Sequence, residues 1–282
     1  MLPTLVVMLR EGVESALIVG IVAAFLGKQG SRRALRTMWI GVVAAALVCV
    51  GVGVGLHVLS QELPQRQQEM LETVIGAIAV AMVTYMVVWM KRHARDLSGS
   101  LRDSAGTALA SGSQWALAAM GFLAVLREGF ESSVFLTALL NNGSDQTAGL
   151  IGAVLGFFVA IAIGYGIYRG GVKLNLTKFF RFTGAVLIVV AAGLVMTALH
   201  TGHEAGWVNV GQVEAFDLSA LVRPGSVQAS LVTGVLGIQP KPVLIEIVGW
   251  LAYLVPMASY LFAPTSARVA GSPASAPAQV SA

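Results

Sequence analysis

The stretch Leu9-Arg10-Glu11-Gly12-Val13-Glu14-Ser15 returns 117 residues later as Leu126-Arg127-Glu128-Gly129-Phe130-Glu131-Ser132, and six of the seven positions are identical. Each copy lies inside a long apolar run. Because both copies carry the same three charges in the same order, composition alone does not explain them. The repeat indicates two related halves, each with charged residues inside an apolar segment.

The composition is that of a polytopic membrane protein. Of the 282 residues, 56% are hydrophobic and only 11% are charged, whereas a soluble domain has about 25% charged residues. The net charge of +4 is no signal for nucleic acid, so we expect membrane lipid, and no nucleic acid, around this chain. The single cysteine, Cys49, excludes a disulfide framework and a thiolate metal site.

The chain contains seven apolar segments near the length of about 20 residues that a membrane span needs. They cover residues 4–27, 37–59, 69–90, 115–140, 148–168, 179–200 and 243–262. The predicted fold class is therefore an all-α polytopic membrane protein with seven transmembrane helices. Residues 1–262 are predicted to form one domain. Residues 263–282, rich in Ala, Ser and Pro, are predicted to form a disordered cytoplasmic tail.

Lysine and arginine gather in every second loop, and this alternation predicts the orientation. The basic loops and the tail hold Lys28, Arg32, Arg33, Arg36, Lys91, Arg92, Arg95, Arg102, Arg169, Lys173 and Arg268. The loops between them are acidic or neutral. Since cytoplasmic loops carry the excess of Lys and Arg, the N-terminus is predicted to lie outside and the C-terminus inside.

This orientation makes the two halves inverted copies of each other. Repeat one covers about 4–90, repeat two covers about 115–200, and residues 243–262 add a seventh helix. Inverted repeats place a shared site near the membrane midplane, where the halves meet. Outside the motif, we expect the halves to share hydropathy and little else. Close helix packing is indicated by Gly51, Gly53, Gly55, Gly152 and Gly156.

Each motif presents two carboxylates and an arginine on one helix face, because residues three and four apart are neighbours on a helix. The candidate metal ligands are Glu11, Glu14, Glu128 and Glu131, supported by Arg10, Arg127, Gly12 and Gly129. A charge at the centre of a span costs about 2.5–3.5 kcal/mol, so these side chains must face one another or water. If all are ionised, they leave a charge of −2, which favours a divalent cation.

The chemistry of the motif leaves several interpretations open. An all-oxygen ligand set suits hard cations such as magnesium, calcium, manganese or iron. A purely structural Arg–Glu network would need one glutamate per arginine, and each motif has two. A membrane di-iron enzyme would use Glu-x-x-His pairs, but Leu17 and Val134 occupy the positions where histidine would be needed.

A second group of ligand types is predicted at the outer surface. It consists of Glu69, Glu72, His200, His203 and Glu204. The first two lie at the start of the third span, and the other three lie at the end of the sixth. We interpret them as candidates for capturing a metal ion outside the membrane. The alternative is that they are ordinary solvated charges at helix ends.

The doubled Arg-Glu-Gly-x-Glu motif resembles the oxidase-dependent iron transporter family, which comprises fungal high-affinity iron permeases and bacterial EfeU-type ferrous iron permeases. The bacterial branch is the more similar. Supporting stretches are Gln68-Glu69-Met70-Leu71-Glu72, Gly170-Gly171-Val172-Lys173-Leu174-Asn175-Leu176 and His203-Glu204-Ala205-Gly206-Trp207.

The resemblance implies a transporter, not an enzyme: a high-affinity permease that imports ferrous iron from the periplasm to the cytoplasm across the bacterial inner membrane. It implies that the motif glutamates are iron ligands in the path. Iron is then the transported substrate, and no cofactor is bound permanently. The resemblance also implies periplasmic cupredoxin-like and haem peroxidase-like partners. The ligand set alone leaves open another hard divalent cation such as manganese.

Overall fold

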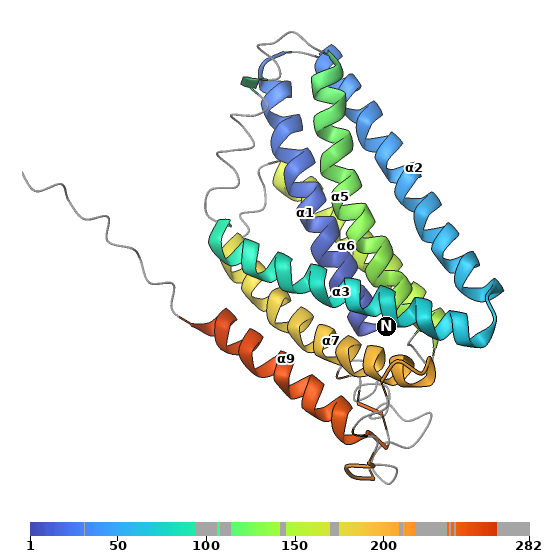
Figure 1. Cartoon of the computed structure of the whole chain (residues 1–282). Helices are drawn as coiled ribbons and strands as arrows, with labels where there is room; N and C mark the ends of the chain where they lie inside the picture. Colours follow the sequence, from blue (N-terminus) through green and yellow to red (C-terminus); the bar gives the residue numbers. More distant parts are fainter. Residues whose placement is uncertain are drawn as a thin grey trace, which may run out of the picture.

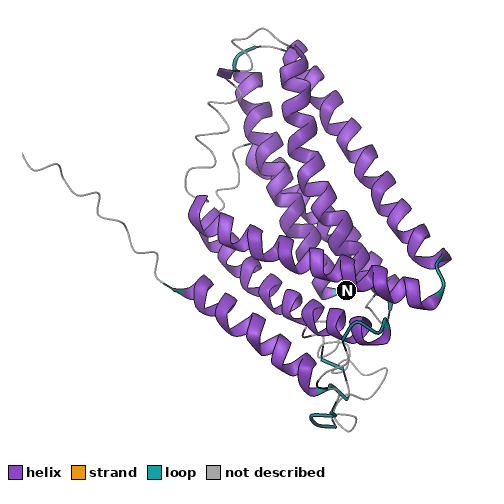
Figure 2. Cartoon of the chain, viewed as in Figure 1, coloured by secondary structure: helices purple, strands orange, loops and turns teal. Residues whose placement is uncertain are grey.

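The computed structural model describes residues 1–30, 32–93, 106–107, 114–141, 145–169, 175–208, 211, 213–217, 236, 238–239 and 241–263. Within these residues the chain forms seven long helices and no strand (Figure 2). The helices are α1 (Leu2–Lys28), α2 (Arg32–Glu62), α3 (Gln65–His93), α5 (Gln114–Asn141), α6 (Gln146–Tyr168), α7 (Leu176–Glu204) and α9 (Leu244–Phe262).

Each predicted span coincides with one of these helices to within a few residues. α2 begins earlier than its predicted span, at Arg32, because arginine is a good helix former and continues the helix beyond the apolar segment. The predicted tail lies outside the described residues except for Ala263, and so do Arg95, Arg102, Lys173 and Arg268.

The length and composition of α2, α3, α6, α7 and α9 suit helices that cross a membrane. α1 and α5 are as long, with 27 and 28 residues, but each carries the three motif charges inside its apolar sequence. Large apolar side chains are exposed along α2 and α6, among them Ile40, Leu47, Val50 and Phe158. An apolar surface of this kind marks contact with a membrane or with another protein. Together with five helices suited to cross a membrane, it indicates that the chain is a multi-pass membrane protein.

The helices form two groups that cross each other (Figure 1). α1 and α5 run side by side in opposite directions, flanked by α6 and α2. α3, α7 and α9 form a layer across them, with α7 between the other two. The hydroxyl oxygens of Thr73 and Thr201 lie 2.7 Å apart and link α3 to α7. Lys91 donates to the carbonyl groups of Tyr260 and Ala263 and so fastens the end of α9 to α3.

Contacts between the helices follow a two-fold pattern. α1 packs mainly against α6, α5 packs mainly against α2, and α3 packs against α7. If α1, α2 and α3 are exchanged for α5, α6 and α7, the α1–α6 pair becomes the α5–α2 pair, and the α3–α7 pair becomes itself. The same holds for the contact of α3 with α5, which becomes the contact of α7 with α1. The pattern of helix contacts is therefore the same for the two sets of three helices.

Two ladders of small residues make the closest pairings possible. They recur every four residues, as Gly41, Ala45, Cys49 and Gly53 on α2 and as Gly152, Gly156, Ala160 and Gly164 on α6. A Cβ atom on Gly129 would lie 2.5 Å from the Cys49 Sγ, and one on Gly12 would lie 2.6 Å from the Ala160 Cβ. Gly41 packs on the carbonyl of Ala118 in the same way as Gly152 packs on that of Met1.

The ladders correct two expectations. The halves share more than hydropathy outside the motif, because both keep small residues at matching positions of the helix that packs on the motif helix. Of the glycines expected to pack, Gly53, Gly152 and Gly156 do so, whereas a Cβ atom added at Gly51 or Gly55 would meet no neighbouring atom within 4 Å. The period of four, and not glycine content, identifies the packed face.

Candidate metal centre

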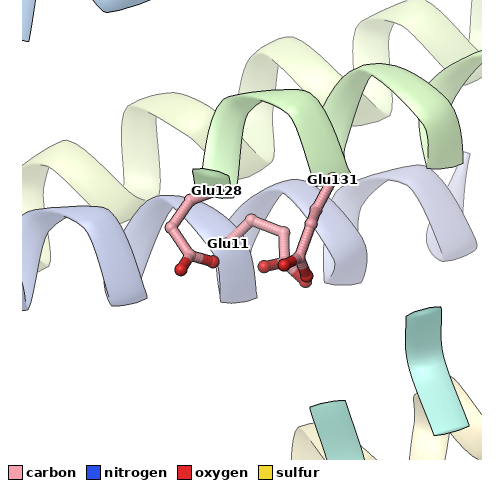
Figure 3. Close-up of side chains that lie close together, drawn as sticks. All are labelled: Glu11, Glu128 and Glu131. Atoms are coloured by element: carbon pink, nitrogen blue, oxygen red, sulfur yellow. The ribbon is translucent and has the colours of Figure 1, made fainter. Parts of the chain in front are cut away.

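Three glutamates of the two motifs meet where α1 and α5 cross. Glu11, Glu128 and Glu131 each offer one carboxylate oxygen, and these oxygens all lie within 4.8 Å of one another. Their side chains extend from the two helices into the same space (Figure 3). Glu11 is 1% exposed, Glu128 2% and Glu131 9%, so the carboxylates are shielded from water by the bundle.

Glu14 lies at the margin of this group. Its side chain is buried, and its Oε2 is 3.9 Å from the Arg10 Nη2. It is near enough to interact electrostatically with Glu128 and Glu131. Glu14 holds the position in the first motif that Glu131 holds in the second, but among the described residues only Glu11, Glu128 and Glu131 have oxygens within 4.8 Å of one another.

The arginine of the first motif is enclosed. Arg10 is 1% exposed, and its Nη1 donates to the Glu11 Oε1 at 3.1 Å and to the Met86 Sδ at 2.6 Å. The Phe180 ring lies 6.0 Å from the guanidinium carbon. Contacts from α1, α3 and α7 therefore hold the Arg10 side chain in one place.

The arginine of the second motif is not enclosed. The side chain of Arg127 is 44% exposed. Its Nε lies 3.3 Å from the Glu131 Oε1 and 3.7 Å from the Glu128 Oε1. Its guanidinium carbon is 5.4 Å from the centre of the Trp89 ring. This distance is within the range of a cation–π interaction. The two arginines thus have matching sequence positions but different surroundings.

Each of the four glutamates keeps one oxygen without a hydrogen bond. The Oε2 atoms of Glu11, Glu14, Glu128 and Glu131 are buried and have no hydrogen-bond partner among the described residues. A buried polar atom without a partner costs about 1–3 kcal/mol, and more when it is charged. Three of these glutamates, Glu11, Glu128 and Glu131, also have carboxylate oxygens within 4.8 Å of one another, a donor set suited to a hard cation.

The glycine of each motif determines how close the supporting helix comes. Gly12 packs against Ala160 of α6, and Gly129 packs against Cys49 of α2. The Ser133 hydroxyl, one turn after Gly129, donates to the Cys49 carbonyl at 3.1 Å. These contacts fix the motif helices from the side opposite α3 and α7.

On that side a cavity of about 1040 Å³ opens between the α1–α6 and α2–α5 pairs. Glu11 and both motif glycines reach its wall, but most of its surface is apolar, with Trp39, Phe157 and other large side chains. An apolar cavity in a membrane bundle accommodates lipid chains more readily than ions.

The structure brings some of the predicted outer residues together. His200 donates from Nδ1 to the Glu246 Oε1 at 2.8 Å, and its Nε2 is 3.5 Å from the Glu204 Oε1. Glu204 interacts electrostatically with Glu72, and Glu69 does so with both Glu72 and His200. One imidazole and several carboxylates therefore gather at the ends of α3, α7 and α9.

His203 plays a different part from the other outer residues. Its Nδ1 donates to the Val208 carbonyl at 2.7 Å, which ties the ring to the turn after α7. Glu246, by contrast, is a residue that the sequence did not single out, although it is 2% exposed and contacts His200 directly. Its position in the first turn of an apolar helix is the only sequence signal, and that position is typical of an ordinary helix cap.

Met86 and Trp89 are further neighbours of the motif arginines that the sequence did not single out. They lie three residues apart on α3 and therefore on one face of it. An apolar span contains many such pairs. The sequence does not distinguish the helix face that contacts the motif arginines from a face that contacts lipid.

Charged side chains buried in a helical membrane bundle mark an ion or substrate path, so the fold and this centre define a membrane transport protein. Residues 1–269 match the iron permease FTR1 family, and the chain belongs to that family. It is accordingly a transporter rather than an enzyme.

Several relatives carry the name ferrous iron permease EfeU, and three of them are described here. That of Escherichia coli O6:K15:H31 (strain 536 / UPEC) is 38% identical over 270 residues, covering 94% of this chain and 96% of the relative. That of Shigella sonnei (strain Ss046) is 40% identical over 255 residues, covering 89% and 91%. That of Yersinia pestis is 40% identical over 263 residues, covering 92% of each. No solved structure matches the chain.

Proposed function

We propose that this protein imports ferrous iron with high affinity from the periplasm to the cytoplasm across the bacterial inner membrane. The observation that carries the proposal is the set of four buried carboxylate oxygens without hydrogen-bond partners among the described residues, one from each of Glu11, Glu14, Glu128 and Glu131. They belong to α1 and α5, two helices that run in opposite directions through an apolar bundle (Figure 1). The names of the relatives support iron as the substrate.

The proposed topology has seven spans, with the N-terminus outside and the C-terminus inside. Residues 1–262 then form one domain, built from two inverted three-helix repeats and a seventh helix. The two-fold pattern of helix contacts supports the inversion. The alternation of basic and acidic loops supports the direction. Inversion places the carboxylates near the membrane midplane, at the interface of the repeats.

Within this centre the glutamates replace the water ligands of the ion as it crosses. The two arginines balance part of the negative charge of the glutamates when no ion is bound. Gly12 and Gly129 let α6 and α2 pack closely enough to hold the motif helices in position. A net charge of −2 from four glutamates and two arginines matches a divalent ion better than a trivalent one.

The outer cluster is proposed as the place of capture. Glu69, Glu72, His200 and Glu204 gather at the ends of α3 and α7, where carboxylates and an imidazole suit ferrous iron. His203 is the weaker candidate because its ring is bound to a carbonyl of the following turn. Periplasmic cupredoxin-like and haem peroxidase-like proteins are the proposed partners on this side. Iron is the substrate, and no permanently bound cofactor is proposed.

Manganese is the second candidate substrate, because oxygen ligands do not separate it sharply from ferrous iron. The experiment is uptake of radioactive iron, kept ferrous by ascorbate, into cells that lack other iron importers. We expect Glu131→Gln to reduce uptake at least about tenfold, as expected for loss of a charged group that acts in the path. An excess of unlabelled manganese should compete weakly.

Glu214→Gln is the matched control, because Glu214 is an exposed glutamate outside the helices. All variants are compared at equal amounts in the membrane. Unchanged uptake by Glu131→Gln at a normal protein level would show that the motif glutamates only brace the helices. Stronger inhibition by manganese than by unlabelled iron would reassign the substrate.

A further inference from the structure

The two motif arginines hold matching positions in the repeats, yet they differ in burial. Arg10 is 1% exposed, whereas the Arg127 side chain is 44% exposed. Both contact the same helix, α3: Arg10 through the Met86 Sδ, and Arg127 through the Trp89 ring. A single face of α3 therefore gives the two arginines different environments.

Arg10 is held from several directions. Its guanidinium donates to both the Glu11 carboxylate and the Met86 thioether, and the Phe180 ring lies beside it. Moving this side chain would break contacts with α1, α3 and α7 at once. Packed interiors resist such displacement, so Arg10 acts as a fixed counter-charge.

Arg127 is held much less firmly. Its Nε donates one hydrogen bond, to the Glu131 Oε1 at 3.3 Å, and lies 3.7 Å from the Glu128 Oε1. Its guanidinium rests on Trp89. A ring face attracts a cation without requiring a particular hydrogen-bond geometry. Arg127 can therefore leave the carboxylates and keep a favourable contact.

The position of Trp89 indicates the side of the membrane that Arg127 faces. Trp89 is four residues from the end of α3 at His93, so Arg127 lies nearer to that end of the helix than to its start at Gln65. An exposed guanidinium is costly in hydrocarbon, so the exposed part of Arg127 marks where water reaches the centre. In the topology proposed above, this end of α3 is cytoplasmic.

We propose that Met86 and Trp89 assign different roles to the two arginines: Arg10 stays as a fixed counter-charge, whereas Arg127 moves onto Trp89 when an ion leaves the carboxylates toward the cytoplasm. Met86 and Trp89 are positioning residues, since they act through the arginines. The kinetic part of this proposal rests on the proposed function. The difference in accessibility between the two arginines does not, but the face from which Arg127 is reached rests on the proposed topology.

The first test measures accessibility without any iron. Arg10→Cys and Arg127→Cys are made separately in a Cys49→Ala background and treated with a membrane-impermeant thiol reagent in inside-out and right-side-out vesicles. We expect the cysteine at position 127 to react from the cytoplasmic face at least about tenfold faster than the one at position 10, as follows from their difference in exposure. Equal rates, or faster reaction at position 10, would overturn the proposal.

The second test measures the kinetics of iron uptake. Trp89→Leu should lower the maximal rate about fivefold or more and leave KM within about twofold, because the ring acts after the ion has bound. Trp89→Phe keeps a ring and should retain most of the rate. Trp39→Leu is the matched control, since Trp39 is an exposed tryptophan on α2.

A rise in KM with an unchanged maximal rate, or equal loss in Trp89→Leu and Trp89→Phe, would contradict the role given to Trp89. Absence of iron uptake by the unmodified protein would refute the proposed function instead. In that case the labelling contrast would still decide whether the two arginines differ.

Discussion

At the scale of single residues, the protein places charge inside an apolar bundle and compensates it only in part. Arg10 and Arg127 contact three of the four motif glutamates within 3.7 Å. One oxygen of every motif glutamate remains without a hydrogen bond within the described part of the chain. Replacing only one partner of a buried ion pair is strongly destabilising. Glutamine in place of glutamate also removes the charged partner, but it keeps the size of the side chain and one acceptor oxygen, so the amount of folded protein is checked for each variant.

A second buried charge lies outside the motif, at Glu246. Its carboxylate receives one hydrogen bond from His200 and another from the backbone N–H of Val243. Removing the imidazole in His200→Ala leaves a buried oxygen without its partner, which costs about 1–3 kcal/mol. We therefore expect a lower melting temperature for this variant in detergent.

His203→Ala is the comparison for that measurement, because the His203 ring bonds to a turn carbonyl and its loss should shift the melting temperature less. A double variant, His200→Ala with Glu246→Gln, should recover part of the loss because no buried charge remains. Equal melting temperatures for the His200→Ala variant and the unmodified protein would refute a structural role for the pair.

At the scale of helices, the ladders of small residues do more to set the architecture than the motif does. They bring α2 onto α5 and α6 onto α1, with glycine next to backbone carbonyl groups at Gly41 and Gly152. Backbone atoms cannot move aside as the end of a flexible side chain can. The motif then lies between two tightly joined helix pairs.

This arrangement predicts which glycines tolerate a larger residue. Gly41→Leu should abolish the monodisperse folded protein, since the new side chain would collide with the Ala118 carbonyl and overpacking costs about 1–3 kcal/mol or more. Gly51→Leu should be tolerated, because Gly51 is exposed and has no atom near it. Fluorescence-detected size-exclusion chromatography of both variants checks this. Similar profiles for the two would contradict the packing described.

At the scale of the whole molecule, the sequence predicts the helices well and their assembly less well. Apolar length alone locates each helix, because about 20 residues must match the thickness of the bilayer. The doubled motif predicts that Glu11 and Glu128 meet, since both halves must bury the same charges. The neighbours of these charges were not predictable, because Met86 and Trp89 look like any other residues of an apolar span.

Two further features of the structure were not predictable from the sequence. The different burial of Arg10 and Arg127 depends on how α3 lies across the bundle, and the two motifs, which differ only at Val13 and Phe130, do not predict it. The contact of Glu246 with His200 joins residues from separate helices, and neither position has a pattern that points to the other. Both features require the three-dimensional structure.

The most direct test of the central claim is equilibrium binding of radioactive ferrous iron to the purified protein in anaerobic detergent solution. The unmodified protein is compared with Glu11→Gln, Glu128→Gln and the control Glu214→Gln. We predict that the two motif substitutions weaken binding at least about tenfold, which is about 1.4 kcal/mol, and that the control binds normally. Undiminished binding by folded Glu11→Gln and Glu128→Gln would show that the iron site lies elsewhere.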